Sequence, residues 1–433
     1  MSTIKESLKE IIIGNQTQPQ TKLIPRDLEI ERIPRKATVV LGVRRCGKTS
    51  LLQEYVGRLV NEGLDATRIC HIDFSDDRLL SINNEEPSIV ADAYYELFPE
   101  NHRRKVYFLF DEMQYLDGWE RLVNRLQNTE DCEVNITGSS SKLLLSETSS
   151  VLGGRKMGWT LYCYSYREYL KAKGLPYALS SSKEFKDSQP KSFDEYLKVG
   201  GFPEALLFSN DSSRRVFFQN IANDIVFRDI VLRHNVSKPE ALKAMTIVLF
   251  SMMGCLMTEG KLYQRLSGMH VRISKPTMSE YLDYAVESYC FYFVPIRSYN
   301  LAIQATNGRK VYCADHALAG SVLGASSNNI GQKLENIVFL HLKRHTDEVY
   351  YYKTKSGFEV DFAAGSDDSI QLVQVCADVS DLSTLERETR SLLEAMRELN
   401  LTESTIVTLS DEKEIVSNGS VIHIVPAWKY LLS

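Results

Sequence analysis

The feature that most constrains the fold is a glycine-rich turn at residues 42–49, which reads GVRRCGKT. A short, continuously apolar run (ATVVLG, 37–42) precedes it, and the segment KTSLLQEYVGRLV that follows has the pattern of a helix. A β-branched apolar run of this kind is typical of a strand that is buried on both faces of a parallel sheet. Strand, turn and helix in this order therefore predict an α/β domain.

The turn also has a spacing that suits phosphate. From Gly42 to Thr49 it follows the pattern Gly-x-x-x-x-Gly-Lys-Thr, in which backbone N–H groups of the loop and the helix start converge on phosphate oxygens. Lys48 would neutralise the β- and γ-phosphates, and the Thr49 hydroxyl would hold Mg²⁺. The two loop arginines either contact phosphate or are solvated charges. The predicted nucleotide-binding residues are Gly42, Arg44, Arg45, Cys46, Gly47, Lys48, Thr49 and Ser50.

A second apolar run, in KVYFLFDEMQ (105–114), ends in a pair of acids. Asp111 at the strand end would hold the Mg²⁺ together with Thr49, and Glu112 would orient and deprotonate the attacking water. An Asp-Glu pair after a strand can also be the start of a helix. Paired with the phosphate-binding turn, it favours the catalytic interpretation and hydrolysis over binding alone.

Three further strands are predicted at 68–74, 132–138 and 159–166, with helical runs such as GWERLVNRLQNT between them. This alternation predicts a parallel sheet with helices on both faces. The fourth strand ends in NITGSSSK, so Thr137 and Ser139 would lie near the γ-phosphate and could sense it, unless the segment is an ordinary serine-rich turn.

Arg155, in LGGRKMG before the last predicted strand, could act as an arginine finger, either within its own subunit or in a neighbouring one. An ordinary loop arginine is the alternative. The base is expected to be adenine, because the chain has no Asn-Lys-x-Asp segment of the kind that commonly reads guanine.

Several of these segments together resemble prokaryotic AAA-type ATPases that carry a carboxy-terminal domain of uncharacterised function. The resemblance rests on VVLGVRRCGKTSLL, FLFDEMQYLDGWERLVNRL, NITGSSSKLL and LGGRKMGWTLYCYSYREYL, and it continues in VGGFPEAL and NDIVFRDIVLRHNV, so that it covers nearly the whole chain. It implies ATP, Mg²⁺, a cytoplasmic protein and the P-loop class that has an additional strand and a catalytic glutamate.

The middle of the chain has the pattern of a winged helix. A helix that ends near Gly268 is followed by a second helix capped by Ser274, with Pro276 in its first turn. Two β-rich runs, CFYFVPIRSY and RKVYCAD, would form the wing, and Asn307-Gly308 between them favours a tight turn.

Charge in this region is compatible with binding to double-stranded DNA. Residues 241–312 contain eight Lys and Arg against four Asp and Glu, a balance of +4 in a chain of net charge −5. Arg272 and Lys275, at the start of the second helix, would contact phosphates. A winged helix is also used simply to pack or to bind proteins, so a protein partner or a homo-oligomer is the alternative.

The carboxy-terminal segment is predicted as a helix, three strands, a helix and two more strands, STIVTL and VIHIVP, and its order α-β-β-β-α-β resembles the restriction-endonuclease-like fold. That fold binds Mg²⁺ through an Asp, matched here by Asp361, and a Glu-x-Lys on the next strand. Glu335 could add a ligand, but Gln374 and Cys376 stand at the Glu-x-Lys positions. Cys376 cannot replace a lysine as a cation. Unless Lys353 or Lys355 compensates, the site is degenerate and nuclease activity is not expected.

Composition limits the remaining choices. The 433 residues predict three domains: a P-loop ATPase domain at 1–180, a helical and winged-helix region at 181–312, and a nuclease-like domain at 313–433. Eight scattered cysteines without Cys-x-x-Cys spacing favour single thiols in a reducing cytoplasm. The longest apolar stretch, 244–257, is too short for a membrane helix. A nucleotide-binding module without turnover, or an ATP-gated nuclease, are the alternative functions.

Overall fold

The structure is a computed structural model that describes residues 4–17, 23–145, 154–324 and 329–433. The chain divides into two compact units. The first comprises Met1–Leu161 with Glu287–Tyr289, and the second comprises Tyr162–Val286 with Cys290–Ser433. The finer division of the chain at residues 180 and 312 stays a prediction.

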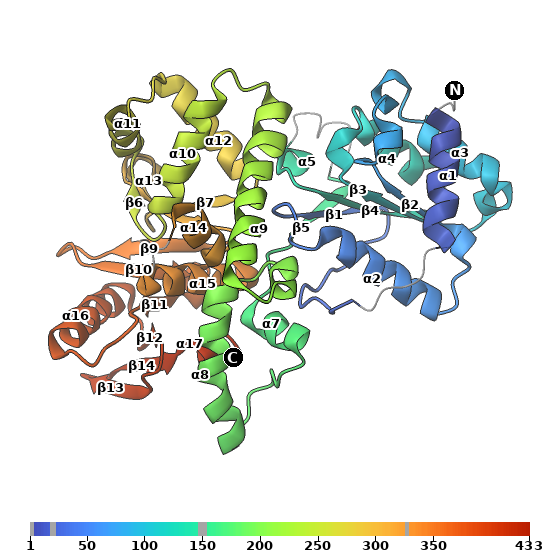
Figure 1. Cartoon of the computed structure of the whole chain (residues 1–433). Helices are drawn as coiled ribbons and strands as arrows, with labels where there is room; N and C mark the ends of the chain where they lie inside the picture. The colour runs from blue at the N-terminus through green and yellow to red at the C-terminus, as the bar shows by residue number, and fades with distance from the viewer. Residues whose placement is uncertain (1–3, 18–22, 146–153, 325–328) are drawn as a thin grey trace. The chain divides into compact units, whose positions relative to one another are not determined.

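The first unit has the predicted parallel sheet, with strand order β2-β3-β4-β1-β5 (Figure 1). Strand β4 lies between β1, which leads into the glycine-rich turn, and β3, which ends in Asp111. This is the P-loop NTPase fold with the additional strand that the resemblance implies. The strands are β1 (Ala37–Leu41), β2 (Ile69–Asp73), β3 (Val106–Asp111), β4 (Cys132–Gly138) and β5 (Lys156–Thr160).

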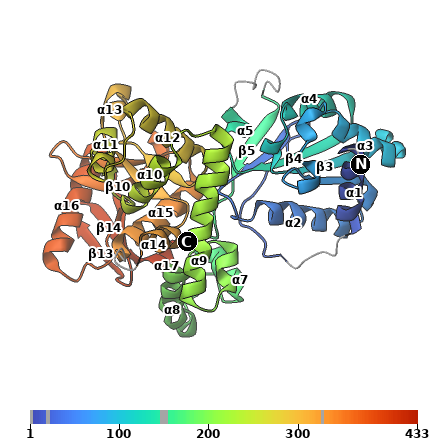
Figure 2. The ribbon, with the colours of Figure 1, turned by 45° about the horizontal axis from the view of Figure 1, so that its top comes forward.

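Helices cover both faces of this sheet (Figures 1 and 2). Helix α2 (Lys48–Asn61) packs Leu52, Tyr55 and Leu59 against one face. The other face carries the larger core, built with α1 (Ile4–Thr17), α3 (Ile89–Leu97) and α4 (Trp119–Thr129). The short helix α5 (Lys142–Leu145) follows β4.

The last strand of this sheet differs from its prediction. It was expected at 159–166, but β5 spans Lys156–Thr160 and pairs only with β1. The more apolar run that carried the prediction continues past Leu161 into the second unit, where Tyr162, Cys163 and Tyr164 are buried. Burial rather than pairing explains why that run is so apolar.

The second unit begins with helices and a small sheet. Helix α11 ends and helix α12 begins where the sequence predicts. The strands β7 and β8 form the predicted antiparallel pair. The predicted tight turn at Asn307-Gly308 is wrong, because the whole segment 295–308, which includes helix α13, connects β7 to β8. The helices are α7 (Tyr166–Lys173), α8 (Lys183–Val199), α9 (Asp211–Asp224), the π-helical η7 (Ile225–Leu232), α10 (Pro239–Ser251), α11 (Glu259–Gly268), α12 (Lys275–Glu287), α13 (Leu301–Thr306) and α14 (His316–Leu323). The sheet has the order β6-β8-β7 and contains β6 (Leu256–Met257), β7 (Phe291–Val294) and β8 (Arg309–Cys313).

The same unit ends in a six-stranded mixed sheet of order β13-β14-β12-β11-β10-β9. Helices α15 (Ile330–His345) and α16 (Leu382–Leu399) lie on its opposite faces (Figure 2). The predicted order of elements is confirmed, with β13 added as an edge strand. The elements are β9 (Val349–Lys353), β10 (Glu359–Ala364), β11 (Gln371–Val375), β12 (Glu403–Thr408), β13 (Lys413–Ser417), β14 (Ser420–Pro426) and α17 (Ala427–Tyr430).

Candidate functional site

Two glycines shape the turn between β1 and α2. Gly42 has no room for a side chain, because a Cβ there would lie 2.2 Å from the carbonyl oxygen of Leu161. Gly47 has φ 104°, in the left-handed region, and it is the N-cap of α2 without a side chain that could accept from the helix start. The first N–H groups of α2 therefore face an anion-binding position instead of a capping side chain.

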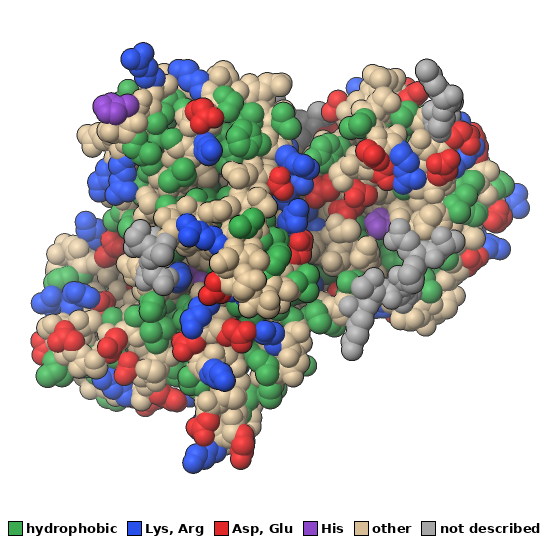
Figure 3. Space-filling view, viewed as in Figure 1, with side chains coloured by type: hydrophobic (Ala, Val, Ile, Leu, Met, Phe, Trp, Pro, Cys, Tyr) green, Lys and Arg blue, Asp and Glu red, His purple; other side chains and the backbone are tan. Residues whose placement is uncertain are grey.

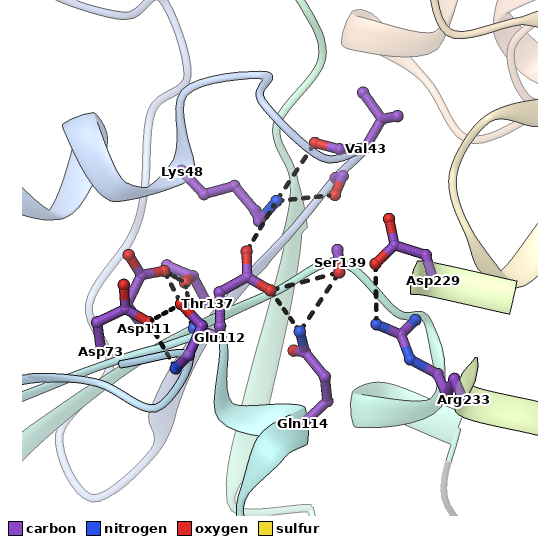
Figure 4. A network of polar contacts seen from close by, with 12 residues as sticks. Val43, Lys48, Asp73, Asp111, Glu112, Gln114, Thr137, Ser139, Asp229 and Arg233 are labelled. Atoms are coloured by element: carbon purple, nitrogen blue, oxygen red, sulfur yellow. Dashed lines mark hydrogen bonds and ion pairs between the residues drawn. The ribbon is translucent and has the colours of Figure 1, made fainter. Parts of the chain in front are cut away.

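Lys48 lies inside this turn (Figure 4). Its side chain is 3% exposed, and its Nζ donates to the carbonyl oxygens of Gly42 (3.1 Å) and Val43 (3.2 Å). The same Nζ lies 3.6 Å from Oε1 of Glu112. The loop thus holds the ammonium group between the glycine-rich turn and the end of β3.

The other predicted loop residues are divided between surface and interior. Arg45, Thr49 and Ser50 are exposed, whereas Arg44 is half-buried. Cys46 is fully buried, so its side chain contributes to the packing under the loop. Burial also raises the pKa of its thiol. Its carbonyl oxygen accepts from Arg26 (2.9 Å), a contact that no local pattern in the sequence indicates.

Asp111 has the environment of a metal ligand. It is fully buried, its Oδ1 accepts from the hydroxyl of Thr137, and its Oδ2 has no hydrogen-bond partner. Burial raises the pKa of Asp111, although the nearby hydroxyl groups of Thr137 and Thr49 oppose the rise. A buried carboxylate with an unpartnered oxygen beside the Thr49 hydroxyl fits a divalent cation, because a cation would compensate the cost of burying the charge.

Glu112 follows with backbone angles of φ 49° and ψ 46°, in the left-handed region. Its Oε2 accepts from Nε2 of Gln114 and from Oγ of Ser139 (3.3 Å), and Gln114 Nε2 also lies 3.3 Å from the same Oγ (Figure 4). The carboxylate is therefore oriented by two polar side chains that come from the ends of two neighbouring strands. The structure brings Glu112 and Ser139 together, as the strand-end argument predicts.

Gln114 belongs to the candidate site but was not among the predicted residues. Its Oε1 is buried and has no hydrogen-bond partner, while its Nε2 holds Glu112. The signal in the sequence is a polar residue two positions after Asp111-Glu112, in a segment that also has the pattern of a helix start.

Arg155 lies away from this site. Its carbonyl oxygen accepts from the N–H of Ala37, the first residue of β1, so it lies at the amino edge of the sheet. Its guanidinium donates to the amide oxygens of Asn124 (2.8 Å) and Asn128 (2.6 Å). The turn at Gly42–Thr49 lies at the carboxyl edge of the sheet. The prediction that Arg155 acts as an arginine finger on the site of its own subunit is therefore wrong. A role in a neighbouring subunit stays a prediction.

The acids of the carboxy-terminal sheet surround a lysine. Asp361 and Glu335 do lie together, but both contact Nζ of Lys310, at 2.7 and 3.1 Å. Gln374 is buried, Cys376 donates to the carbonyl oxygen of Asp378, and Lys353 and Lys355 are exposed. Neither of the two exposed lysines makes an ion pair with Asp361 among the described contacts. The compensating cation is Lys310, which the sequence analysis assigned only to the charge of the winged helix.

No helix in the described part of the chain is both long and apolar enough to cross a membrane.

Three family models match successive segments of the chain. They are an AAA domain at residues 34–170, a domain of unknown function (DUF8612) at 190–329 and another (DUF4143) at 330–430.

Similar proteins occur in archaea and bacteria. The chain is 28% identical over 435 residues to the uncharacterized protein MJ1544 of Methanocaldococcus jannaschii, covering 98% of this chain and 95% of that protein. It is 30% identical over 352 residues to an uncharacterized protein of Haemophilus influenzae, covering 79% of this chain and 83% of that protein.

Solved structures match only weakly. The Aeropyrum pernix ORC1 protein in complex with DNA matches with a TM-score of 0.29 and 12% identity, over 74% of this chain and 91% of that one. Cdc6p from Pyrobaculum aerophilum matches with a TM-score of 0.25 and 14% identity, over 73% of this chain and 92% of that one. These values are too low to carry any function across. The AAA model and the relatives at 28–30% identity decide the family: the chain belongs to an archaeal and bacterial family of AAA-type P-loop ATPases in which domains of unknown function follow the ATPase domain.

Proposed function

We propose that the chain hydrolyses ATP in a Mg²⁺-dependent reaction at the carboxyl edge of the first sheet. The observation that carries this proposal is the buried Asp111, whose Oδ2 has no partner although the Thr49 hydroxyl lies beside it. A P-loop that served only as a structural turn would have no reason to bury an uncompensated acid next to a catalytic-type glutamate.

Each residue has a defined task in this reaction. Thr49 and Asp111 would hold Mg²⁺, which supplies positive charge for the phosphate oxygens when it is bound. The N–H groups at the start of α2 and the ammonium group of Lys48 bind the phosphates. Glu112 accepts the proton of the attacking water, and Gln114 with Ser139 fixes the direction of its carboxylate.

Replacing Lys48 with alanine tests nucleotide binding. We expect the affinity for a fluorescent ATP analogue to fall roughly 10- to 100-fold or more, because a buried charge-assisted contact with the phosphates is lost. Lys105→Ala is the matched control, since Lys105 precedes β3 at the amino edge of the same sheet and pairs with Glu133. Equal affinities for wild type and Lys48→Ala would show that phosphate binds elsewhere.

We further propose that α11, α12 and the β7-β8 pair form a winged helix that contacts double-stranded DNA. At the start of α12, Arg272 and Lys275 are exposed, whereas the opposite face of the helix is buried through Met278, Tyr281, Leu282 and Ala285. On the face seen in Figure 3, Lys and Arg side chains outweigh acidic ones around these helices. An exposed basic helix start on a packed scaffold is what phosphate contacts require.

The double variant Arg272→Ala/Lys275→Ala tests this contact. We expect weaker binding to duplexes of any sequence, and a slope of log affinity against log salt that is shallower by about 2, because two phosphate contacts are lost. Binding is measured by fluorescence anisotropy at several salt concentrations. Lys343→Ala, on α15, removes one surface charge as a control. If wild type and variant have the same affinity and slope, the partner is a protein instead.

The two proposals meet in one assay. If the P-loop site is coupled to the winged helix, duplex DNA should change the rate of Mg²⁺-dependent ATP hydrolysis in the full chain. The presence of ATP analogue or ADP should then also change the solution scattering of the protein, as in switch ATPases. A rate that is indifferent to DNA would favour a protein partner.

A further inference from the structure

Lys310 is a buried lysine with a complete set of partners. It is 2% exposed, and its Nζ lies 2.7 Å from Asp361, 3.0 Å from Glu359 and 3.1 Å from Glu335. An ammonium group has three N–H donors, so three carboxylates use its whole capacity. These four residues are the Lys310 cluster.

The cluster joins three elements of the second unit. Lys310 comes from β8, Glu335 from α15, and Glu359 and Asp361 from β10. The pairing of β10 with β9 shifts register between Val360 and Ala363, and a bulge of this kind redirects a side chain. The polypeptide is thus shaped to bring the acids onto one nitrogen.

The carboxylates are also fixed from their other sides. Glu335 accepts from the hydroxyl of Tyr312 (2.6 Å), and the second oxygen of Asp361 accepts from the N–H of Val375 (2.9 Å). Glu335 Oε2 lies against the backbone at Gly254, where a Cβ would be 3.0 Å away. Asp361 and Glu335 therefore have little freedom to leave Lys310.

The amide oxygen and nitrogen of Gln374 are both already bonded within the protein, so Gln374 is not available as an oxygen ligand. Its amide oxygen accepts from the N–H of Asp361 (3.0 Å), and its amide nitrogen donates to Glu388 (2.7 Å). Arg387 donates to the other oxygen of Glu388. In the described structure, both acids next to Gln374 are thus already paired with a cation: Asp361 with Lys310, and Glu388 with Arg387.

We propose that the ammonium group of Lys310 is the resident cation of this carboxylate site, and that the site takes no divalent cation while Lys310 is present. Lys310 occupies the position where a metal would meet Asp361 and Glu335. The ion pairs of the Lys310 cluster then hold β8 against α15 and β10. The site does not perform metal-dependent phosphodiester hydrolysis. This inference is independent of the ATP site.

The protonation states agree with a resident cation. Burial lowers the pKa of Lys310, but the charges of Asp361, Glu335 and Glu359 outweigh burial and raise it well above its ordinary value. Burial, followed by the charge of Asp361, raises the pKa of Glu335 to about 7. Lys310 thus stays charged at neutral pH, as a permanent cation must.

Isothermal titration with Mn²⁺ tests the proposal on the full chain. All variants carry Asp111→Asn, so that the ATP site lacks the carboxylate proposed to bind Mg²⁺. We expect the parent and its Asp361→Asn derivative to bind equal amounts of Mn²⁺, because Asp361 is bound to Lys310. Lys310→Met should gain about one equivalent, and Lys310→Met/Asp361→Asn should lose it again. Lys343→Met, which removes a partly exposed lysine of α15 outside the Lys310 cluster, should gain none.

Two results would overturn the proposal. If the parent binds one equivalent more than its Asp361→Asn derivative, the cluster is an ordinary metal site in which Lys310 is an accessory. If folded Lys310→Met gains no equivalent, the carboxylates do not form a cation site. Should Lys310→Met fail to fold, the comparison of the parent with Asp361→Asn still decides whether the native site takes a metal.

Discussion

Glu112→Gln should lower the rate of ATP hydrolysis by a factor of about 100 to 10,000, while the affinity for ATP changes little. The substitution keeps the shape of the side chain but removes the group that accepts a proton from water. It leaves the contacts of the phosphates with Lys48 and the start of α2 in place. Turnover is measured as phosphate release under saturating Mg²⁺ and ATP, and affinity by titration with a fluorescent analogue.

Glu62→Gln is a suitable control, because Glu62 is an exposed residue just after the end of α2. It should leave both quantities unchanged. Turnover in Glu112→Gln close to that of the wild type would remove Glu112 from the mechanism. A wild type that binds ATP without measurable turnover would instead make the chain a nucleotide-binding module, which is the first alternative function.

The arrangement of the candidate nucleotide site could be predicted in large part because its parts are local patterns. Gly42, Gly47 and Lys48 lie in one turn, and Asp111 and Ser139 each follow a recognisable apolar strand. In a parallel sheet the ends of such strands meet at one edge, so chain order alone brings them together. The same rule explains why Arg155 is not at this site. Arg155 precedes its strand, so it lies at the opposite edge of the sheet.

Orientation within the site could not be predicted in the same way. That Gln114 holds Glu112 depends on the left-handed backbone of Glu112 and on the side chain of Ser139, which is 25 residues further along the chain. Position in a strand predicts which edge a residue occupies, but hydrogen bonds between side chains depend on packing that no local pattern specifies.

The carboxy-terminal site shows the limit most clearly. The sequence indicates Asp361 and Glu335 by their positions on a strand and a helix, and it shows that Cys376 replaces a lysine. It gives no sign that Lys310 supplies the cation, because Lys310 precedes Glu335 by 25 residues and Asp361 by 51. A lysine in an exposed-looking β-hairpin is most often solvated, so burial of this one had to come from tertiary packing.

Lys310→Met should destabilise the second unit by about 3–5 kcal/mol, which is the largest effect on stability that we expect from any single substitution. Met fills a similar volume, but Asp361, Glu359 and Glu335 would then share a largely buried space without their cation. The lost attraction matters less than the desolvated charges that are left without compensation.

Urea unfolding in EDTA measures this effect, with Trp119→Phe and Trp159→Phe in the background so that Trp428 alone reports on the second unit. Trp428 is 7% exposed, and the centroid of its ring lies 6.0 Å from that of Phe185. Its fluorescence should therefore change when that unit unfolds. Lys343→Met, which breaks the pair of the partly exposed Lys343 with the fully exposed Asp347, should cost less than about 1 kcal/mol.

A further substitution separates lost charge from lost packing. Adding Glu335→Gln and Asp361→Asn to Lys310→Met removes the charges of the two more buried acids but restores no packing. Glu359, whose side chain is 34% exposed, keeps its charge. If charge is the cause, the triple variant should recover most of the lost stability, since a buried ion pair replaced as a whole by neutral groups often costs little. If the triple variant is as unstable as Lys310→Met, Lys310 contributes through its aliphatic chain, and the Lys310 cluster is not an electrostatic joint.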